Sequence, residues 1–551
     1  MAHNRNTRMP SVMTDRFSQV PRADIPRSVL NRSFGHKTSF SAGLLIPFFV
    51  DEALPGDTIN FRMQGFARLT TPRHPIMDNM YLETFFFSCP NRLLWDNWQK
   101  FMGEQTNPGD STDFLVPQLL VPEPGGFETY SLADYFGLPV GIGGGTGPDY
   151  AWTVSAMPFR AYNLIYNEFF RDQNLVNSAP TITIDADSSI SNYPVRRRGK
   201  RYDYFTSCLP WPQKGAPVTI PVGTTAPVVS TQNPVYMYES TQAQVGSLAS
   251  KSGTHDVRML TVSPATGDQS LRFATEQEQA GATGLQTDLT NATSITINEL
   301  RQAFQIQKLL ERDARGGTRY IEKIKAHFGV TSPDYRLQRP EFLGGGRTPV
   351  IVSPVAQTSS SVTGSQDPSP QGNLAAVGTV NVNGHGFMKS FTEHEWVMGI
   401  LCVRADLTYQ YGVERMWSRK TLYDFYFPAL SNLGEQAVLQ KEIFVTNNKT
   451  DNEKVFGYQE RHAEYRHKLS LITGAMRSAP TGSTKSLDVW HLSEKRTAAP
   501  VLNQAFIEEN PPVDRVLAVQ DEPHFIFDSW STIKHARPMP IYAVPGLIDH
   551  F

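Results

Sequence analysis

A short basic segment followed by aromatic residues is the part of this sequence best suited to binding chemistry. Residues 195–217 read VRRRGKRYDYFTSCLPWPQKGAP, and five of the six residues from Arg196 to Arg201 are basic. Cationic side chains bind phosphate groups, and aromatic side chains offer unpaired bases a surface for stacking. The segment therefore predicts a contact with single-stranded DNA. The candidate DNA-binding residues are Arg196, Arg197, Arg198, Lys200, Arg201, Tyr202, Tyr204 and Phe205.

Two other interpretations of this segment stay open. A run of like charges is usually a solvated face of the protein. The segment can also lie in a contact between subunits, with its arginines paired to carboxylates of a neighbouring copy. The chain as a whole has 51 basic and 53 acidic residues and a formal net charge of −2. Because no global basic field exists, any contact with nucleic acid must come from a local patch.

No complete catalytic motif is present in the sequence. The stretch GIGGGTG (141–147) lacks the third glycine of the dinucleotide fingerprint, and His394-Glu395 lacks the second histidine of a zincin helix. An all-β carbohydrate-active enzyme would need a pair of carboxylates that cannot be located. The cysteines are too scattered for a disulfide framework or a cysteine zinc site: Cys89, Cys208 and Cys402. We therefore predict no enzyme activity, no metal site and no cofactor.

Short strands separated by glycine and proline form the main pattern of the chain. The 40 glycines and 39 prolines are spread along it and favour an all-β body with long loops. Residues 57–69 alternate between apolar and polar types, as a half-buried strand does. Residues 80–89 are apolar on both faces, which is typical of a strand between two packed layers. Further strands are expected at 395–410 and near 454–472, 486–492 and 524–535.

Helices are few in this pattern. Thr296 and Glu299 have the spacing of a capping box, and an apolar helical face follows until Gly316 and Gly317. A shorter helix is predicted over 318–328, closed by Gly329. Two further stretches are rich in glycine and proline and predict long loops: 103–150 and 340–385.

Two segments differ in composition from the rest. Residues 1–40 form a basic arm with little apolar content, which predicts order only on binding a neighbour or a polyanion; a disordered tail is the alternative. Residues 216–292 contain three basic residues and are otherwise mostly polar. Their valines and tyrosines predict a small β-rich insertion, and a flexible linker is the alternative.

Long specific stretches connect the chain to a known family. They are SVLNRSFGHKTSFSAGLLIPFFVDEALPGDTINF (28–61), GKRYDYFTSCLPWPQKG (199–215), ERDARGGTRYIEKIKAHFGVTSPDYRLQRPEFLGGG (311–346) and FGYQERHAEYRHKLS (456–470). On these residues the chain resembles the major capsid proteins of the gokushovirus branch of the Microviridae, which are small phages with single-stranded DNA. The resemblance spans almost the whole chain and is weakest at 216–292.

The resemblance implies an eight-stranded viral jelly roll with long loops, a few short helices and a large β-rich insertion. The body would comprise 41–215 and 293–551. Residues 216–292 would form a surface protrusion at the three-fold axis of a T=1 icosahedral shell. This shell would enclose circular single-stranded DNA, and the protrusion would contact the host cell surface.

The resemblance also implies partners and a location. A scaffolding protein, a DNA-packaging protein and a pilot protein are the expected partners, and the virion, assembled in the host bacterial cytoplasm, is the expected location. Membrane insertion is not expected, because the longest strongly apolar run is the eight-residue GLLIPFFV, 43–50. The alternative function is a single-stranded-DNA-binding protein that forms no shell.

Overall fold

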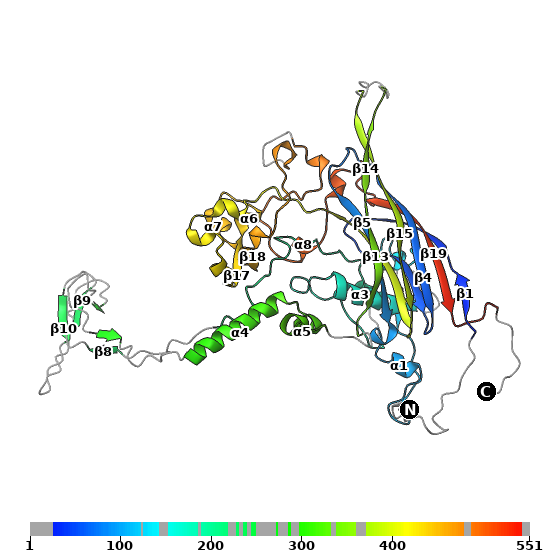
Figure 1. Cartoon of the computed structure of the whole chain (residues 1–551), viewed down its shortest axis with the longest axis horizontal. Helices are drawn as coiled ribbons and strands as arrows, with labels where there is room; N and C mark the ends of the chain where they lie inside the picture. The colour runs from blue at the N-terminus through cyan, green and yellow to red at the C-terminus, as the bar shows by residue number, and fades with distance from the viewer. Residues whose placement is uncertain are drawn as a thin grey trace, which may run out of the picture. The chain divides into compact units, whose positions relative to one another are not determined.

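The protein is described here by a computed structural model. It describes residues 26–122, 125–142, 152–185, 189–218, 228–230, 235–239, 244–248, 271–273, 285–287, 297–331, 338–359, 371–478 and 486–542. The described residues are mostly antiparallel strands joined by long loops, with a few short helices (Figure 1). The predicted all-β class is therefore confirmed.

Two antiparallel sheets form the body. The first contains β1 (Ser28–Asn31), β2 (Phe34–Phe40), β4 (Thr58–Leu69), β14 (Ile351–Ala356), β15 (Leu374–Ser390) and β19 (Phe525–Arg537). The second contains β3 (Ile46–Ala53), β5 (Met80–Pro90), β13 (Glu341–Pro349) and β16 (Glu395–Ala405). Two small two-stranded sheets pair β6 (Gln118–Leu120) with β7 (Thr153–Ser155), and β17 (Glu435–Leu439) with β18 (Val455–Glu460).

The strand order is that of a jelly roll. The first sheet runs β2-β19-β4-β15 and the second β3-β16-β5-β13. If these eight strands are numbered along the chain, the orders become 1-8-3-6 and 2-7-4-5. This is the double Greek-key connectivity of viral jelly rolls, so the predicted fold is confirmed. The connection from β5 to β13 spans residues 91–340 and carries the whole insertion.

The main hydrophobic core lies between the two sheets. Along β4 every second residue is buried, from Ile59 to Leu69, as the predicted alternation requires. Phe61 stands at the centre, with its ring 4.7 Å from that of Phe49, 4.9 Å from Phe86 and 5.6 Å from Phe387. The aromatic side chains of both sheets therefore interdigitate in one packed layer.

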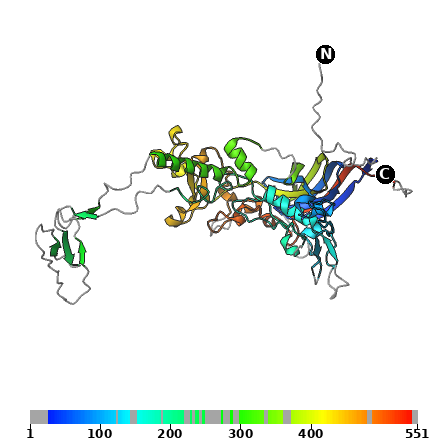
Figure 2. The ribbon, with the colours of Figure 1, turned by 90° about the horizontal axis from the view of Figure 1, so that it is seen from below.

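The outer face of the second sheet is covered by the connection between β5 and β13. Helices α2 (Leu132–Tyr135) and α3 (Met157–Ile165) contribute to a second hydrophobic cluster with the outward side chains of β5 and β16. Figure 2 shows these cyan helices beside the strands. Because both faces of β16 are covered, all of its residues except one are buried. By contrast, the outward residues of β4 and β19 in the first sheet are largely exposed.

A third hydrophobic cluster lies under the loops between β16 and β19. It includes residues of β17, β18 and α8 (Gln504–Ile507), together with Tyr204 and Phe205. The other short helices of the body are α1 (Trp98–Phe101), α5 (Tyr320–Phe328), α6 (Gln440–Ile443) and α7 (Lys449–Asn452). Helix α5 ends at Gly329, which adopts a left-handed φ of 71°, so the predicted closure of this helix is confirmed.

One loop prediction and one strand prediction were wrong, and one further strand prediction was correct only in part. Residues 340–385, expected to be loops, contain β13, β14 and part of β15. Residues 486–492, expected to be a strand, contain only a turn of 3₁₀ helix at Asp488–Trp490. The expected strand near 454–472 ends at Glu460. The glycines of β13 explain the first error, because a Cβ at Gly345 would lie 2.3 Å from the carbonyl oxygen of Thr84.

Residues 213–317 form a compact unit of their own. It holds α4 (Ile297–Arg315) and the described strands β8 (Val228–Ser230), β9 (Val235–Glu239), β10 (Gln244–Leu248), β11 (Leu271–Phe273) and β12 (Leu285–Thr287). The helix predicted before Gly316 is thus confirmed, but it belongs to this unit rather than to the body. The boundaries 216–292 stay a prediction. Residues 1–25 of the predicted arm lie outside the described residues, and residues 28–40 form β1 and β2.

Candidate nucleic-acid interface

The basic segment runs as an extended strand of backbone between two other parts of the body. On one side the amide of Leu45 donates to the carbonyl of Arg196 at 2.9 Å. On the other side the amide of Lys200 donates to Ile507 at 2.7 Å, and the amide of Glu509 donates to Arg198 at 2.7 Å. These backbone hydrogen bonds fix the segment in place, so its side chains have defined directions.

The first two arginines of the segment are half-buried and contact neutral groups. Arg196 donates from Nε to Asn163 at 3.2 Å, and its guanidinium lies 5.0 Å from the ring centre of Tyr166. Burial lowers the pKa of Arg196 below its ordinary value. Arg197 donates to the backbone oxygen of Glu509 at 3.2 Å. Both side chains therefore bind the protein itself.

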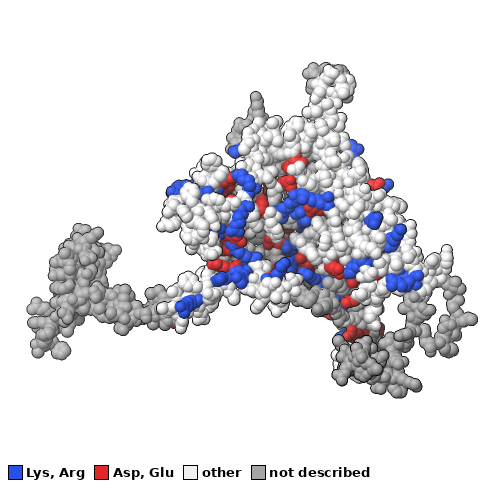
Figure 3. Space-filling view, viewed as in Figure 1, with Lys and Arg blue, Asp and Glu red and all other residues white. Residues whose placement is uncertain are grey.

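The next part of the segment surrounds a buried carboxylate. Glu83, on the outer face of β5, is 6% exposed. Arg198 pairs with it, Arg404 approaches to 2.9 Å, Arg201 to 3.6 Å and Arg347 to 3.7 Å. Figure 3 shows acidic and basic side chains gathered together in the middle of one face of the molecule. Four arginines thus share one carboxylate.

The environment of Glu83 strongly favours its ionised form. Burial alone would raise the pKa of this carboxyl group, but the positive charges of Arg198 and Arg404 outweigh burial and hold the pKa below its ordinary value. Burial lowers the pKa of Arg404, and the positive charge of Arg198 adds to that effect. The carboxylate is therefore the counter-charge that makes this concentration of arginines tolerable within the body.

The remaining cations of the segment are also paired inside the chain. Lys200 is 8% exposed, donates to the backbone oxygen of Phe506 at 2.7 Å and pairs with Glu494. Arg201 donates to Asp406 at 2.6 Å. Arg198, Lys200 and Arg201 can therefore find carboxylate partners within the body itself.

Of the three aromatic residues predicted to stack with bases, one is exposed and two are buried. Tyr202 is 74% exposed, whereas Tyr204 is 3% and Phe205 1% exposed. Tyr204 donates its hydroxyl to Glu442 at 2.8 Å, and Phe205 packs within the third cluster. Of the predicted stacking surfaces, only Tyr202 is open in this structure.

The structure brings the predicted basic residues together, but they contact the protein itself: Arg198, Lys200 and Arg201 form ion pairs, and Arg196 and Arg197 contact neutral groups. DNA binding by residues 196–205 stays a prediction, and it would compete with the internal ion pairs of Arg198, Lys200 and Arg201. The residue that sequence reasoning missed is Glu83. Its signal is nevertheless present, because Glu83 is a charged residue inside the apolar run MYLETFFFSC, and such a residue needs a buried partner.

Known proteins identify the family of this chain. The family described as "Capsid protein (F protein)" matches residues 18–547. The capsid protein VP1 of Bdellovibrio phage phiMH2K is 46% identical over 97% of this chain and 98% of its own length. The chain belongs to the capsid protein (F protein) family.

Two further members of the family support the same assignment. The capsid protein VP1 of Chlamydia phage 1 is 42% identical over 98% of this chain, and 99% of that protein is covered. The capsid protein VP1 of Spiroplasma virus 4 is 37% identical over 96% of this chain and 97% of that protein. The resemblance to gokushovirus capsid proteins is therefore confirmed, and the function that these relationships favour is that of a major capsid protein rather than a DNA-binding protein without a shell.

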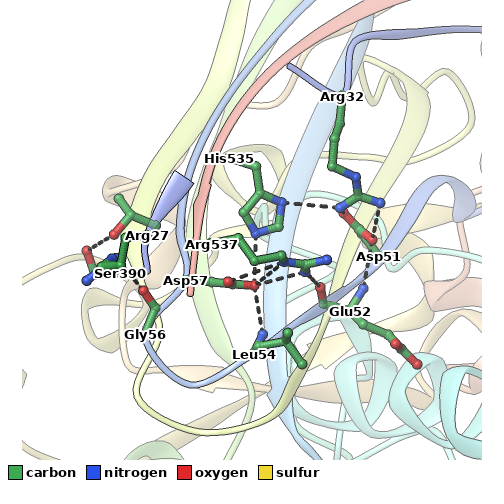
Figure 4. A network of polar contacts seen from close by, with 11 residues as sticks. Arg27, Arg32, Asp51, Glu52, Leu54, Gly56, Asp57, Ser390, His535 and Arg537 are labelled. Atoms are coloured by element: carbon green, nitrogen blue, oxygen red, sulfur yellow. Dashed lines mark hydrogen bonds and ion pairs between the residues drawn. The ribbon is translucent and has the colours of Figure 1, made fainter. Parts of the chain in front are cut away.

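A second polar network ties the start of the capsid body to its last described strand (Figure 4). Asp57 is fully buried and accepts hydrogen bonds from the amide of Leu54 at 2.8 Å and from Arg537 at 2.9 Å. His535, also fully buried, places Nε2 2.8 Å from the same carboxylate. Arg32 lies 3.2 Å from the other nitrogen of His535.

Acid is expected to weaken this network in two steps. Burial lowers the pKa of His535 below its ordinary value of 6.5, so the unfolded chain takes up a proton first as the pH falls. Burial would raise the pKa of Asp57, but hydrogen bonds from Arg537, Leu54 and His535 hold it below its ordinary 3.8. Stability is therefore lost first below pH 6.5 and again as the pH falls through the lowered pKa of Asp57.

The His535→Gln variant tests the first of these steps. One proton taken up only by the unfolded state gives a slope of at most about 1.4 kcal/mol per pH unit. Urea unfolding of wild type and variant between pH 7 and 5 should show a shallower loss of stability in the variant. Parallel curves for the two proteins would contradict a neutral, buried His535.

Two negative findings apply to the described ranges. No group of three or more His, Cys, Asp or Glu side chains is arranged there to hold a metal ion. No helix among those residues is long and apolar enough to cross a membrane.

Proposed function

We propose that this capsid protein is the repeating subunit of a closed T=1 icosahedral shell that encloses circular single-stranded DNA. The supporting observation is the agreement between the two-sheet jelly roll and full-length matches to three phage capsid proteins. A jelly roll has flat sides, and copies that associate through them can form a shell with few exposed strand edges.

The loops of the body also suit a subunit that works in an assembly. Large apolar side chains stand exposed on them, among them Trp417 at 76%, Leu422 at 66% and Tyr423 at 68%. Where exposed apolar side chains gather into a large patch, the patch usually marks a contact with another protein. Contacts between copies that stay together are large and more apolar than ordinary surface.

Electron microscopy of the purified full-length protein tests this proposal. Closed particles of uniform diameter are expected. Dispersed monomers that retain affinity for single-stranded DNA would instead support the alternative function of a DNA-binding protein without a shell.

The unit formed by residues 213–317 is proposed to carry the contact with the host cell. Residues 216–292 within it have few basic side chains, which suits a surface away from a nucleic acid genome. In the same proposal they protrude at the three-fold axis of the shell. The decisive experiment removes residues 216–292. The proposal expects particles that still form shells but no longer infect the host.

Scaffolding, DNA-packaging and pilot proteins are the proposed partners in the virion, and assembly in the bacterial cytoplasm is the proposed route.

A further inference from the structure

Among the residues that the structure describes, none forms a second layer over the outward face of the first sheet. In β4 and β19 the odd-numbered residues from Ile59 to Leu69 and from Phe525 to His535 are buried, and the even-numbered ones from Arg62 to Arg68 and from Ile526 to Lys534 are exposed. Two of the outward side chains are large aromatic groups, Phe66 at 50% and Trp530 at 55% exposed. An aromatic residue at an outward position breaks the polar pattern of the strand and loses apolar burial that the core would provide.

The two aromatic side chains are neighbours on this face. Phe66 pairs with Asp528 and Trp530 pairs with Gln64, so Phe66 and Trp530 occupy diagonal positions of adjacent strands. Opposite Trp530 on β2 stands Gly35, where a Cβ would lie 3.3 Å from the indole ring. The absence of a side chain there gives the indole room. A shallow open groove of about 760 Å³ runs past both aromatic residues.

The same face carries an excess of free positive charge. Its outward cations are Lys37, Arg62, Arg68 and Lys534, and its one outward acid on β4 and β19 is Asp528. Among the residues that the structure describes, none of these four cations forms an ion pair, in contrast to the cations at 198–201. Figure 3 shows basic side chains along the right-hand side of the molecule, where Figure 1 places β4, β19 and β1.

We propose that this sheet face, and specifically Phe66, Trp530 and the four cations, binds single-stranded DNA. The proposal rests on the proposed function and names the surface of the shell subunit that meets the genome. Exposed aromatic rings stack with unpaired bases, and cations around them neutralise the backbone without reading sequence.

The chemistry of the face favours this occupant over another protein. Outward amide side chains, Gln64 on β4 and Asn381 on β15, line the groove and can donate to phosphate or base edges. A contact with a second copy of this near-neutral chain would bury the four cations, and that requires carboxylates opposite them. A duplex hides its base faces, so the aromatic residues favour a single strand.

The first test measures affinity for a labelled oligodeoxythymidylate with full-length subunits. A stacked base contributes roughly 5- to 150-fold in affinity. Replacing both aromatic residues (Phe66→Ala with Trp530→Ala) is therefore expected to weaken binding at least about 25-fold, taking about fivefold for each ring. A duplex of the same length should bind more weakly than the single strand to the wild-type protein. Equal affinity of wild type and variant for the single strand would overturn the proposal.

The second test measures the salt dependence of the same binding. Four phosphate contacts to a single strand give a slope of log affinity against log salt of about −2.8, and removing two of them lowers its magnitude by about 1.4. The double variant Arg62→Gln with Arg68→Gln should show this change. An unchanged slope would mean that these cations do not contact phosphate and would overturn their part in the site.

Matched controls separate this face from exposed side chains elsewhere. Trp417→Ala removes an aromatic residue that is 76% exposed outside the sheet, and Lys420→Gln with Lys495→Gln removes two exposed cations outside it. Neither control should change affinity or slope by as much as the sheet variants do. If a control variant weakens binding as much as the sheet variants do, DNA binds nonspecifically to exposed side chains. That result would overturn the proposal of a specific site on the sheet.

Electron microscopy of the same variants distinguishes the failure of this proposal from failure of the proposed function. Shells with normal diameter and reduced DNA content are expected from the sheet variants. Loss of shells with unchanged oligonucleotide affinity would show a contact between copies and overturn the proposal. If the wild-type protein binds the oligonucleotide through this face but forms no shells, the proposed function is contradicted and the proposed DNA-binding surface is supported.

Discussion

A Glu83→Ala variant is expected to lose about 3–5 kcal/mol of stability, the usual effect of removing one partner from a buried ion pair. Four arginines lie within 4 Å of this one carboxylate, and their charges would be left without it. Because folded domains are stable by only about 5–15 kcal/mol, the variant should give little soluble protein and no shells. Thermal unfolding and particle yield measure the effect.

An exposed ion pair provides the matched control. Glu453 is paired with Lys449 at 4.0 Å on the surface, and its side chain is 59% exposed. Glu453→Ala should change stability by less than about 1 kcal/mol. If the Glu83→Ala and Glu453→Ala variants unfold at the same temperature, the charge of Glu83 does not stabilise the arginines around it.

The Arg198→Ala variant separates the structural role of the basic segment from the predicted DNA contact. Removal of Arg198 takes one of the charges that stabilise ionised Glu83, so a structural role predicts lower stability in empty shells. Combination with Glu83→Ala should then cost less than the sum of the two changes, because the variants share one interaction. A fully stable Arg198→Ala shell with reduced DNA content would favour the contact with DNA instead.

Particles that lack residues 216–292 are expected to assemble and to lose infectivity. The segment lies within a compact unit that is separate from the jelly-roll body, so its removal leaves both sheets complete. Attachment through many copies gains about 10²–10⁴ in avidity, so loss of every copy should lower plaque counts by about 100-fold or more.

The deletion needs a control for assembly itself. Shell diameter and thermal stability of the deleted particles, measured beside the wild type, supply it. If shells fail to form, the segment is part of the assembly contacts, and the proposed role in host contact loses its support.

The sheets could be predicted where burial leaves a regular pattern in the sequence. Strand β4 alternates because one face meets the core and the other meets solvent, and β5 is apolar throughout because both faces are covered. Strand β13 could not be predicted in this way. Its glycines at 344–346 remove the side chains that would signal a strand, and they do so because neighbouring groups occupy that space.

The candidate sites show a similar division. The composition of 196–205 located a dense group of cations, but a charge run does not reveal which distant carboxylate neutralises it. Glu83 lies more than a hundred residues earlier in the chain and meets Arg198 only because β5 carries it to the edge of the segment. Phe66 and Trp530 were hidden for the opposite reason, since an aromatic residue within a strand is normally assigned to the core.

The position of β19 has a consequence for how the subunit is made. This strand is the eighth of the jelly roll along the chain, yet it lies between β2 and β4 within the first sheet. At about 5–20 residues per second, the ribosome needs roughly half a minute to two minutes to reach residues 525–537. Until then β2 lacks β19, its pairing partner among the described strands, and the core lacks Phe525 and Phe527. Nascent subunits on a polysome therefore cannot present a finished sheet to one another, which delays assembly until each chain has been synthesised through β19.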